Sequence, residues 1–436
     1  MTDEAMEVRD ASAGYALQAD RPAVPEGYKQ TEVGVIPKDW VLFQFGDIFE
    51  FRNGVNADKN SYGKGIYFVN VLEPITHSHI YGPEIAGQVS LPEAVVAPYI
   101  IQAGDILFNR TSESPEELGL ASAYLGTDRV VFGGFVIRGR PLGNRLDSAY
   151  AGYSLRAPSI RKQIIPMGQG AIRTNIGQKN LSLVVVPLPP LLEQRAIATA
   201  LSDVDALLES LDRLIAKKRD IKQATMQQLL TGEVRLPGFE GEWEKRKLGT
   251  IAVIRSGGTP STSNDEFWNG DIPWCTPTDI TGLQGRKYLS ATNRSISDAG
   301  LKMSSAELIP PGSIIMTTRA TIGECAINTL PVTTNQGFKN LEPTSADCEY
   351  LYYLMTTQKQ RLLQLCAGST FLEVGKKQLE IFDLYLPEDV EEQRAIATVL
   401  SDMDAVIETL EQRRAKTASL KQAMMQELLT GRTRLI

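Results

Sequence analysis

The sequence predicts an α+β protein in which two mixed α/β domains are separated by two long repeated helices, packed as an antiparallel coiled coil with a pseudo-two-fold axis. Three observations predict this class. Residues 193–236 recur at 392–435 without a gap, and 27 of the 44 positions are identical, which indicates a duplicated unit. An unbroken apolar periodicity runs through both copies. Short apolar segments bounded by glycine and proline precede each copy.

Length and composition exclude several classes of protein. The 436 residues suggest two to four domains, and 42% hydrophobic with 22% charged residues indicates a globular chain. No run of about 18 apolar residues occurs, so no membrane span is predicted. The acidic N-terminus lacks the features of a secretory signal, and we expect a cytoplasmic protein. The net charge of −7 argues against a nucleic-acid binder, but the charge is unevenly spread.

The repeated segment predicts a long helix in each copy. Glu193–Thr231 contains no glycine or proline, and Gly232 and Gly431 follow the two copies as stops. Apolar residues recur at alternating spacings of four and three, which is typical of a coiled-coil seam. The predicted seam residues are Ile197, Leu201, Val204, Leu208 and Leu211 in the first copy and Ile396, Leu400, Met403, Ile407 and Leu410 in the second. The simplest arrangement pairs the two helices antiparallel; two helical tails docked on their own domains remain the alternative.

A fainter repeat precedes each helix. Trp40, Gly46, Arg52 and Gly54 recur at the same intervals as Trp243, Gly249, Arg255 and Gly257. The predicted organisation is a flexible tail at 1–24, a first domain at 25–190, a central helix at 191–236, a second domain at 237–386 and a C-terminal helix at 387–436. Strands are predicted at Ile66–Val71, Asp105–Asn109, Val130–Ile137, Leu183–Pro187, Ile314–Thr318 and Phe382–Leu386, and short helices near Ala149–Ser154 and Glu349–Leu365.

Positive charge is concentrated in the first domain. Residues 129–190 contain nine bases and one acid, whereas 237–385 has a balance of −2. Arginine dominates this segment, and its planar guanidinium suits phosphates and guanine edges. The glycine-rich loop 168–180 ends the segment, and loop 367–379 corresponds to it, with Phe371 in place of Arg173. An ordinary solvated basic face is the alternative.

Motifs for catalysis are missing from the sequence. The chain lacks phosphate-binding glycine loops, a nucleophile elbow, a zinc-protease helix and the polar-Pro-Pro-aromatic tetrapeptide of base methylation. The four cysteines form no CxxC pair, and His77 and His79 are the only histidines. We therefore predict no catalytic residues, no metal site and no cofactor in this chain.

The motifs resemble those of the specificity subunit of type I restriction-modification systems. The resemblance lies in GYKQTEVGVIPKDW (27–40), GDILFNR with its echo GSIIMTTR, TNQGFKNL (334–341), LPPLLEQRAIA (188–198) and LLTG at 229–232 and 428–431. It covers residues 26–436. It implies that each domain is a target recognition domain that reads one half of a split, asymmetric DNA site. It also implies that the helices set the spacing of the half-sites and dock modification subunits.

The resemblance implies partners that carry the chemistry. Double-stranded DNA, two modification (methyltransferase) subunits and restriction or motor subunits are the expected partners. S-adenosylmethionine, ATP and Mg are expected to be used by those subunits. One departure is an acidic insertion, SESPEEL, within Thr111–Leu118, which the second domain lacks. The candidate DNA-binding residues are Arg110, Arg138, Arg140, Arg145, Arg156, Arg161, Lys162, Arg173, Asn175, Lys179, Arg319, Lys339, Phe371, Lys376 and Lys377.

Two other functions stay open from the sequence. A coiled-coil scaffold with two protein-interaction domains and no DNA role would fit the acidic overall charge. A self-contained nuclease or methyltransferase would require a catalytic motif that the sequence does not contain.

Overall fold

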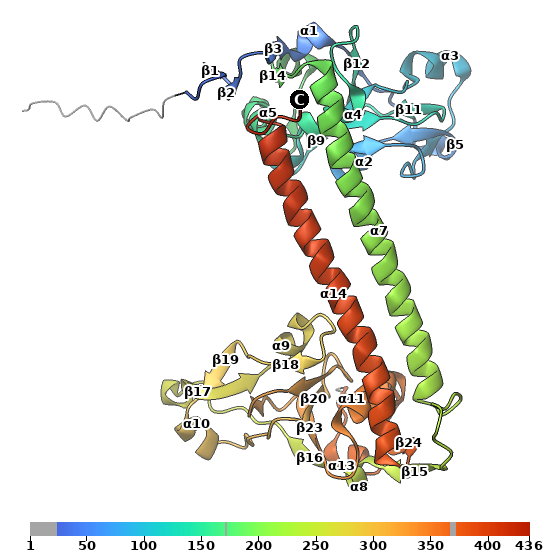
Figure 1. The fold of residues 1–436 in the computed structure, drawn as a ribbon, viewed down its shortest axis with the longest axis vertical. Coiled ribbons are helices and arrows are strands. Elements are labelled where there is room, and N and C mark those ends of the chain that lie inside the picture. Colours follow the sequence, from blue (N-terminus) through green and yellow to red (C-terminus); the bar gives the residue numbers. More distant parts are fainter. Residues whose placement is uncertain (1–23, 171, 367–371) are drawn as a thin grey trace, which may run out of the picture. The chain divides into compact units, whose positions relative to one another are not determined.

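The computed structural model describes residues 24–170, 172–366 and 372–436 (Figure 1). The chain divides into two compact units: unit 1 comprises Met1–Glu209 with Ala415–Ile436, and unit 2 comprises Ser210–Arg414. Each unit contains one mixed α/β domain and a part of each long helix. The unit boundaries therefore fall inside the helices, and not at the ends of the predicted domains. The predicted tail, 1–24, lies outside the described residues apart from Val24.

A five-stranded sheet forms the core of domain 1, the α/β part of unit 1. Its order is β4-β12-β8-β10-β6, and all neighbours are antiparallel except the parallel β10–β6 pair. These strands are β4 (Phe49–Asn53), β6 (His79–Ile80), β8 (Ile106–Asn109), β10 (Ala121–Tyr124) and β12 (Val136–Pro141). A three-stranded sheet has the order β11-β5-β7, with β5 (Tyr62–Val69), β7 (Gln88–Val89) and β11 (Val130–Phe132).

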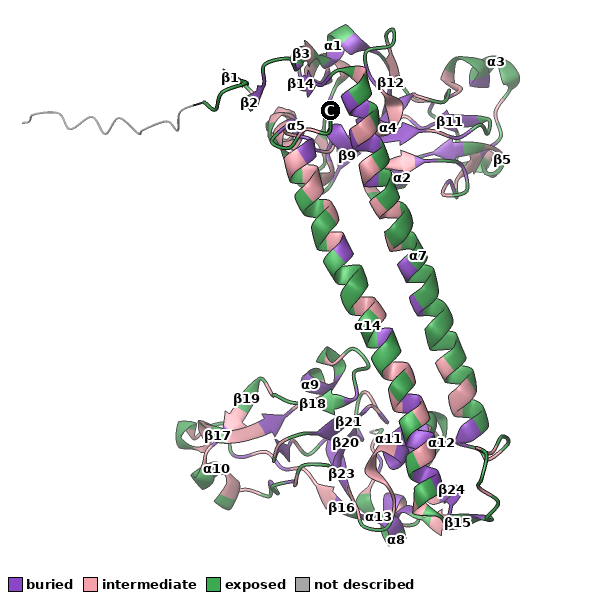
Figure 2. Ribbon diagram, viewed as in Figure 1, coloured by how far each residue is buried: buried purple, intermediate pink, exposed green. Residues whose placement is uncertain are grey.

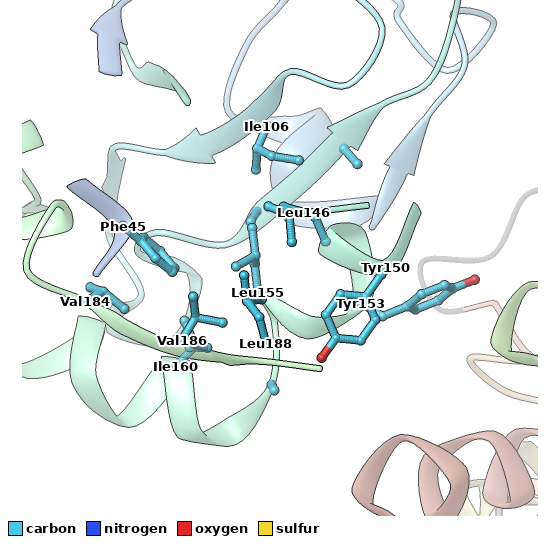
Figure 3. Close-up of a cluster of buried hydrophobic side chains, with 14 of the residues drawn as sticks. Phe45, Ile106, Leu146, Tyr150, Tyr153, Leu155, Ile160, Val184, Val186 and Leu188 are labelled. Atoms are coloured by element: carbon cyan, nitrogen blue, oxygen red, sulfur yellow. The ribbon is translucent and has the colours of Figure 1, made fainter. Parts of the chain in front are cut away.

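Short strand pairs and helices complete domain 1. The pairs are β1 (Tyr28–Thr31) with β2 (Gly34–Pro37), β3 (Val41–Gln44) with β14 (Val185–Leu188), and β9 (Thr111–Ser112) with β13 (Thr174–Asn175). The helices are α1 (Phe45–Ile48), α2 (Leu72–Thr76), α3 (Glu93–Val96), α4 (Ser148–Ser154), α5 (Pro158–Ile164) and α6 (Gln178–Leu181). Figure 3 shows part of the core of domain 1, in which Phe45, Ile106, Tyr150 and Leu155 belong to one cluster of buried side chains.

Domain 2, the α/β part of unit 2, repeats this topology. Its five-stranded sheet, in the order β16-β23-β20-β21-β18, contains β16 (Ala252–Ser256), β18 (Tyr288–Leu289), β20 (Ile314–Thr317), β21 (Cys325–Asn328) and β23 (Phe338–Pro343). The second sheet has the order β19-β17-β22, and β15 pairs with β24. These strands are β15 (Trp243–Lys247), β17 (Trp268–Cys275), β19 (Arg294–Ile296), β22 (Thr333–Thr334) and β24 (Asp383–Pro387). The helices are α8 (Leu248–Ile251), α9 (Pro277–Gly282), α10 (Asp298–Lys302), α11 (Cys348–Thr357), α12 (Lys359–Leu365) and α13 (Lys376–Glu380).

Two predicted elements are each divided in the structure. The strand predicted at Val130–Ile137 is two strands in different sheets, because the backbone turns at Gly133 and the N–H of Val136 bonds to the Gly133 carbonyl. The helix predicted at Glu349–Leu365 is α11 followed by α12, with Gln358 between them. The ends of the other predicted strands and helices lie within four residues of the ends of an observed strand or helix.

The long helices are α7 (Leu191–Leu229) and α14 (Val390–Leu428). Each is followed, three residues after its end, by a glycine with positive φ, Gly232 at 74° and Gly431 at 70°, as expected for the predicted stops. Exposed residues predominate along the middle of both helices (Figure 2). Of the predicted seam, Ile197, Leu201, Leu211, Ile396, Leu400 and Ile407 are buried, and Val204, Leu208, Met403 and Leu410 are half-buried.

The buried start of each helix packs into a domain core. Ile197 and Leu201 belong to the main core of domain 1, together with Leu428 and Leu429 from the end of α14. In unit 2, Ile396 and Leu400 from the start of α14 lie in the domain core with Leu229 and Leu230 from the end of α7. The start of one helix therefore lies beside the end of the other in each unit, which confirms antiparallel packing.

A buried carboxylate joins each domain to both helix ends. In unit 1, Glu193 of α7 is fully buried; its carboxylate accepts a hydrogen bond from Trp40 Nε1 at 3.1 Å and an ion pair from Arg434. Arg434 also pairs with Asp39. In unit 2 the equivalent contacts are made by Glu392, Trp243 and Arg235. The same junction is thus built twice, with the roles of the two helices exchanged.

A second polar contact repeats in the same way. Tyr153 donates a hydrogen bond to Asp205 of α7 at 2.8 Å, and Asp205 pairs with Lys421 of α14. In unit 2, Tyr353 donates to Asp404 of α14 at 2.6 Å, and Asp404 pairs with Lys222 of α7. Unit 2 adds the helix–helix pairs Asp212–Arg414 and Arg219–Glu411. Ion pairs between the helices therefore accompany the apolar seam in both units.

Candidate nucleic-acid interface

In domain 1, three segments meet where β8 ends. Arg110 follows β8; its N–H bonds to the Phe135 carbonyl at 2.8 Å, and its Nη1 donates to the Gly134 carbonyl at 3.2 Å. The next residues form the β9–β13 ribbon, in which Thr111 lies opposite Asn175. Arg173, Asn175 and Phe135 are all exposed. We call Arg110, Phe135, Arg173 and Asn175 the ribbon surface of domain 1.

Domain 2 places the same backbone at the end of β20. The N–H of Thr318 bonds to the Gly337 carbonyl, and the N–H of Val374 bonds to the Thr318 carbonyl. Thr318 thus corresponds to Arg110, one residue before the match with Arg319 that the sequence motifs suggested. Arg319 lies opposite Glu373 in the position that Thr111 and Asn175 occupy in domain 1. We call Arg319, Lys339 and Glu373 the ribbon surface of domain 2.

Both ribbon surfaces contain an arginine paired with a glutamate. In domain 1, the Arg173 guanidinium bonds to Glu113 of the acidic insertion at 2.9 Å, and both side chains are exposed. In domain 2, Glu373 pairs with Arg319 at 2.7 Å and lies 3.6 Å from Lys339 Nζ. Burial lowers the pKa of Lys339, whose side chain is only 8% exposed. The acidic insertion therefore contacts the glycine-rich loop 168–180 of domain 1. In domain 2, the Glu373 carboxylate partly neutralises the positive charges of Arg319 and Lys339.

Three of the residues predicted to contact DNA use their guanidinium groups inside domain 1. Arg138 is 2% exposed, and burial lowers its pKa. Arg140 binds buried Asp105 through two N–H groups at 2.8 and 2.7 Å, and this hydrogen bonding raises its pKa. The Arg156 guanidinium donates to four backbone carbonyls, those of Pro74, Ile75, His77 and Ala121.

The remaining predicted cations are spread over several places. Arg161 donates to the Glu116 carbonyl, and burial lowers its pKa to about 10. Arg145 is exposed and its guanidinium lies 5.2 Å from the centre of the Phe43 ring. Lys162 lines a groove of about 1090 Å³ beside the end of α14. Lys179, Lys376 and Lys377 are exposed on α6 and α13. Phe371 lies outside the described residues.

The three-stranded sheets present a feature that the sequence analysis missed. In domain 1, Tyr62 and Phe68 of β5 contact edge to face, with ring centres 5.3 Å apart. In domain 2, Trp268 and Trp274 of β17 make the same contact at 4.9 Å, and both strands bulge between the paired rings. The only signal for it in the sequence is a pair of aromatic residues six positions apart, a spacing that places both on one face of a strand.

In the ranges 24–170, 172–366 and 372–436, no group of three His, Cys, Asp or Glu side chains is placed to hold a metal ion. His79 is half-buried, between Ser78 and the Ala149 carbonyl, and its ring contacts the Tyr153 ring edge to face. The four cysteines are free thiols, and burial raises the pKa of Cys348 to about 12. None of the helices in these ranges has the length and apolarity that a membrane crossing requires.

Comparison with known proteins gives one family for both domains. The model of the type I restriction modification DNA specificity domain matches residues 37–217 and again residues 240–418. Each match begins in one domain and continues into the long helix that follows it. The two copies together account for most of the chain.

Individual relatives agree with the family match. The chain is 41% identical over 170 residues to the type I restriction enzyme MjaIX specificity subunit of Methanocaldococcus jannaschii, covering 38% of this chain and 39% of that protein. It is 24% identical over 436 residues to the MjaVIII specificity subunit of the same organism, covering 94% and 96%. The crystal structure of the type I restriction-modification S subunit from M. genitalium superposes with a TM-score of 0.56 at 15% identity, over 89% of this chain and 96% of that one.

Proposed function

We propose a function from the premise that this chain belongs to the family of type I restriction modification DNA specificity proteins. Its two domains are DNA sequence recognition domains. In our proposal each domain reads one half of a bipartite site, and the two halves have different sequences. The bases between the halves are not read in this proposal.

One observation carries this proposal: the two units share their junctions and differ in their candidate reading surfaces. The contacts of Glu193 and Glu392 with tryptophan and arginine are the same. In contrast, Asn175 at the ribbon surface of domain 1 is replaced by Glu373 in domain 2. Because base edges are read by the type and geometry of side chains, different surfaces support different half-sites.

The length of the helices supports a role in spacing. Each has 39 residues, which corresponds to about 58 Å of helix. Two DNA segments contacted on one face of a duplex are about 10 bp apart, or a multiple of this distance. We propose that α7 and α14 together set the separation of the half-sites.

The exposed faces of the helices support docking of partner subunits. Leu207, Leu214 and Ile221 are spaced by seven residues on α7, and each is about 40% exposed. Val406 and Leu420 occupy the positions of Leu207 and Ile221 in the second copy, and they are 45% and 56% exposed. An apolar stripe with heptad spacing fits the apolar stripe of another helix. We propose that two modification (methyltransferase) subunits dock here, one for each copy.

Catalysis belongs to the partner chains in this proposal. The methyltransferase subunits would use S-adenosylmethionine, and restriction or motor subunits would use ATP and Mg. The chain itself would only recognise the DNA sequence at which the partner subunits act. Because its net charge is −7, we expect the partners to contribute much of the affinity for phosphates.

The proposal is tested by mapping N6-methyladenine at single-molecule resolution in a host that carries this chain with its modification partner. The expected result is methylation within an asymmetric motif of two half-sites separated by unread bases. The partner expressed without this chain is the control, and it should leave that motif unmethylated. A host in which methylation does not depend on this chain would contradict the proposal and favour the scaffold function.

A further inference from the structure

Arg294 of β19 is exposed and stacks on the aromatic pair of domain 2. Its guanidinium carbon lies 4.0 Å from the centre of the Trp268 ring and 5.0 Å from the centre of the Trp274 ring. Both rings are fixed: Trp268 Nε1 donates to the Ser261 carbonyl and Trp274 Nε1 to the Gly258 carbonyl, each at 3.0 Å. The indole rings therefore hold the guanidinium in a defined position.

Stacking on the two indole rings leaves the N–H donors of the Arg294 guanidinium available to other partners. A cation stacked on an aromatic ring uses the face of the guanidinium plane, whereas its N–H groups lie at the edge of that plane. Within the described ranges no ion pair involves Arg294. Arg319 and Lys339 of the ribbon surface differ in this respect, because both face Glu373. Arg294 is thus a positioned cation with free hydrogen-bond donors.

At the position that corresponds to Arg294, domain 1 has a glycine, Gly87, and therefore no side chain. In domain 2, Arg294 lies opposite Trp274 in the ladder. In domain 1 the pairing of Tyr67 with Gln88 places Gly87 opposite Phe68, and the Phe68 N–H bonds to the Gly87 carbonyl. A Cβ on Gly87 would lie 2.4 Å from the Phe68 carbonyl oxygen, so the backbone excludes any side chain there. The two domains therefore share the aromatic pair, but only domain 2 has an arginine on it.

We propose that Arg294 determines base specificity for domain 2 by donating two hydrogen bonds to O6 and N7 of a guanine in its half-site. This inference rests on the proposed function, because it needs domain 2 to face DNA. A guanidinium whose orientation is fixed matches the two acceptors of guanine in the major groove, and this is the commonest specific contact of arginine with a base. Domain 1 reads its half-site without an equivalent contact.

The test uses the full chain assembled with its modification partner, and it maps the methylated motif for Arg294→Ala and Arg294→Lys. Both variants are expected to lose preference for one G·C pair in one half-site by about 10- to 100-fold, because lysine keeps the charge but lacks the planar fork. The other half-site should be unchanged. Lys302→Ala, which removes an exposed charge from α10 of the same domain, is the matched control and should keep the motif.

The outcomes separate this inference from the proposed function. If the wild-type complex gives no bipartite motif, the proposed function fails. If the wild-type motif appears and both Arg294 variants retain it unchanged, the base contact is wrong. A uniform loss of methylation at every sequence in Arg294→Ala, with full activity in Arg294→Lys, would make Arg294 a phosphate contact and also overturn the inference. Thermal unfolding of the variants, expected to match the wild type, checks that domain 2 is folded.

Discussion

The two units differ least where they join the long helices and most where they present side chains to solvent. Both junctions use a buried glutamate, a tryptophan and an arginine from the segment that follows the other helix. The solvent-facing positions replace Asn175 with Glu373 and Gly87 with Arg294. This contrast indicates that the junctions preserve the geometry of the molecule, whereas the surfaces can change the sequence that is recognised.

The exchange of helix ends makes each junction depend on both helices. Glu193 on α7 needs Arg434 from the segment after α14, and Glu392 on α14 needs Arg235 from the segment after α7. Neither unit can complete its junction with a single helix. The pairing of the helices is therefore specified at both junctions, in addition to the contacts along their length.

The largest expected effect comes from lengthening both helices together. One heptad inserted after Ala216 and another after Glu411 leaves the ion pairs Asp205–Lys421, Asp212–Arg414, Arg219–Glu411 and Lys222–Asp404 in register. Seven residues add about 10 Å of helix, or about three base pairs of duplex. The unread gap should lengthen by this amount or recognition should be abolished, as measured by methylation mapping.

The matched control inserts the heptad after Ala216 only. This variant shifts Lys222 and Arg219 by two helical turns relative to Asp404 and Glu411, so methylation should be lost without a new motif appearing. A complex that keeps its original site after the double insertion would show that the helices do not determine the spacing.

The next-largest expected effect is the loss of stability when the buried glutamate of a junction is replaced, and it should differ between the two junctions. Glu392→Gln removes the only carboxylate paired with Arg235 in the described residues, and we expect it to destabilise unit 2 by about 3 kcal/mol, the cost of breaking a buried ion pair. Glu193→Gln should cost less, because Arg434 keeps Asp39 as a partner. Chemical unfolding followed by tryptophan fluorescence measures both. Glu391→Gln, beside Glu392 but exposed, is the control; equal losses in the two junction variants would contradict the comparison.

A smaller effect distinguishes the ribbon surfaces. Arg173→Ala is expected to weaken binding to the half-site of domain 1 by about 1–3 kcal/mol if Arg173 contacts a base. It should leave the free energy of unfolding nearly unchanged, because the Arg173–Glu113 pair is exposed. Glu113→Gln removes the competing carboxylate and should strengthen binding slightly. Affinity of the assembled complex measured at several salt concentrations tests both; unchanged affinity in Arg173→Ala would remove this residue from the interface.

The smallest effect is a pH dependence confined to unit 1. Burial lowers the pKa of His79 below 6.5, so the unfolded chain binds a proton more readily than the folded one. The stabilising contribution of neutral His79 is complete above about pH 6.5 and declines as the pH falls below it. Domain 2 has Tyr288 at this position of the ladder. Thermal unfolding at pH 7.5 and 5.5 should show a smaller loss for His79→Gln than for the wild type; equal losses would exclude this role.

The sequence determined the organisation of the molecule. The repeat at an offset of 199 gave two copies of one unit, and the glycine-free runs before Gly232 and Gly431 located both long helices to within about two residues. The family followed from the same motifs, and the family model matches both copies. These features are readable because helical periodicity and duplication are patterns along the chain.

Only the tertiary structure decided which charges are available at the surface. Arg138 and Arg156 look like surface cations in a basic segment, but one is buried in a sheet and the other binds carbonyls up to 82 positions away along the chain. Arg294, in a segment without net positive charge, is exposed on two rings that come from another strand. Burial and ion pairing depend on partners that are distant in sequence, so local composition located the basic segment and could not assign the role of each residue in it.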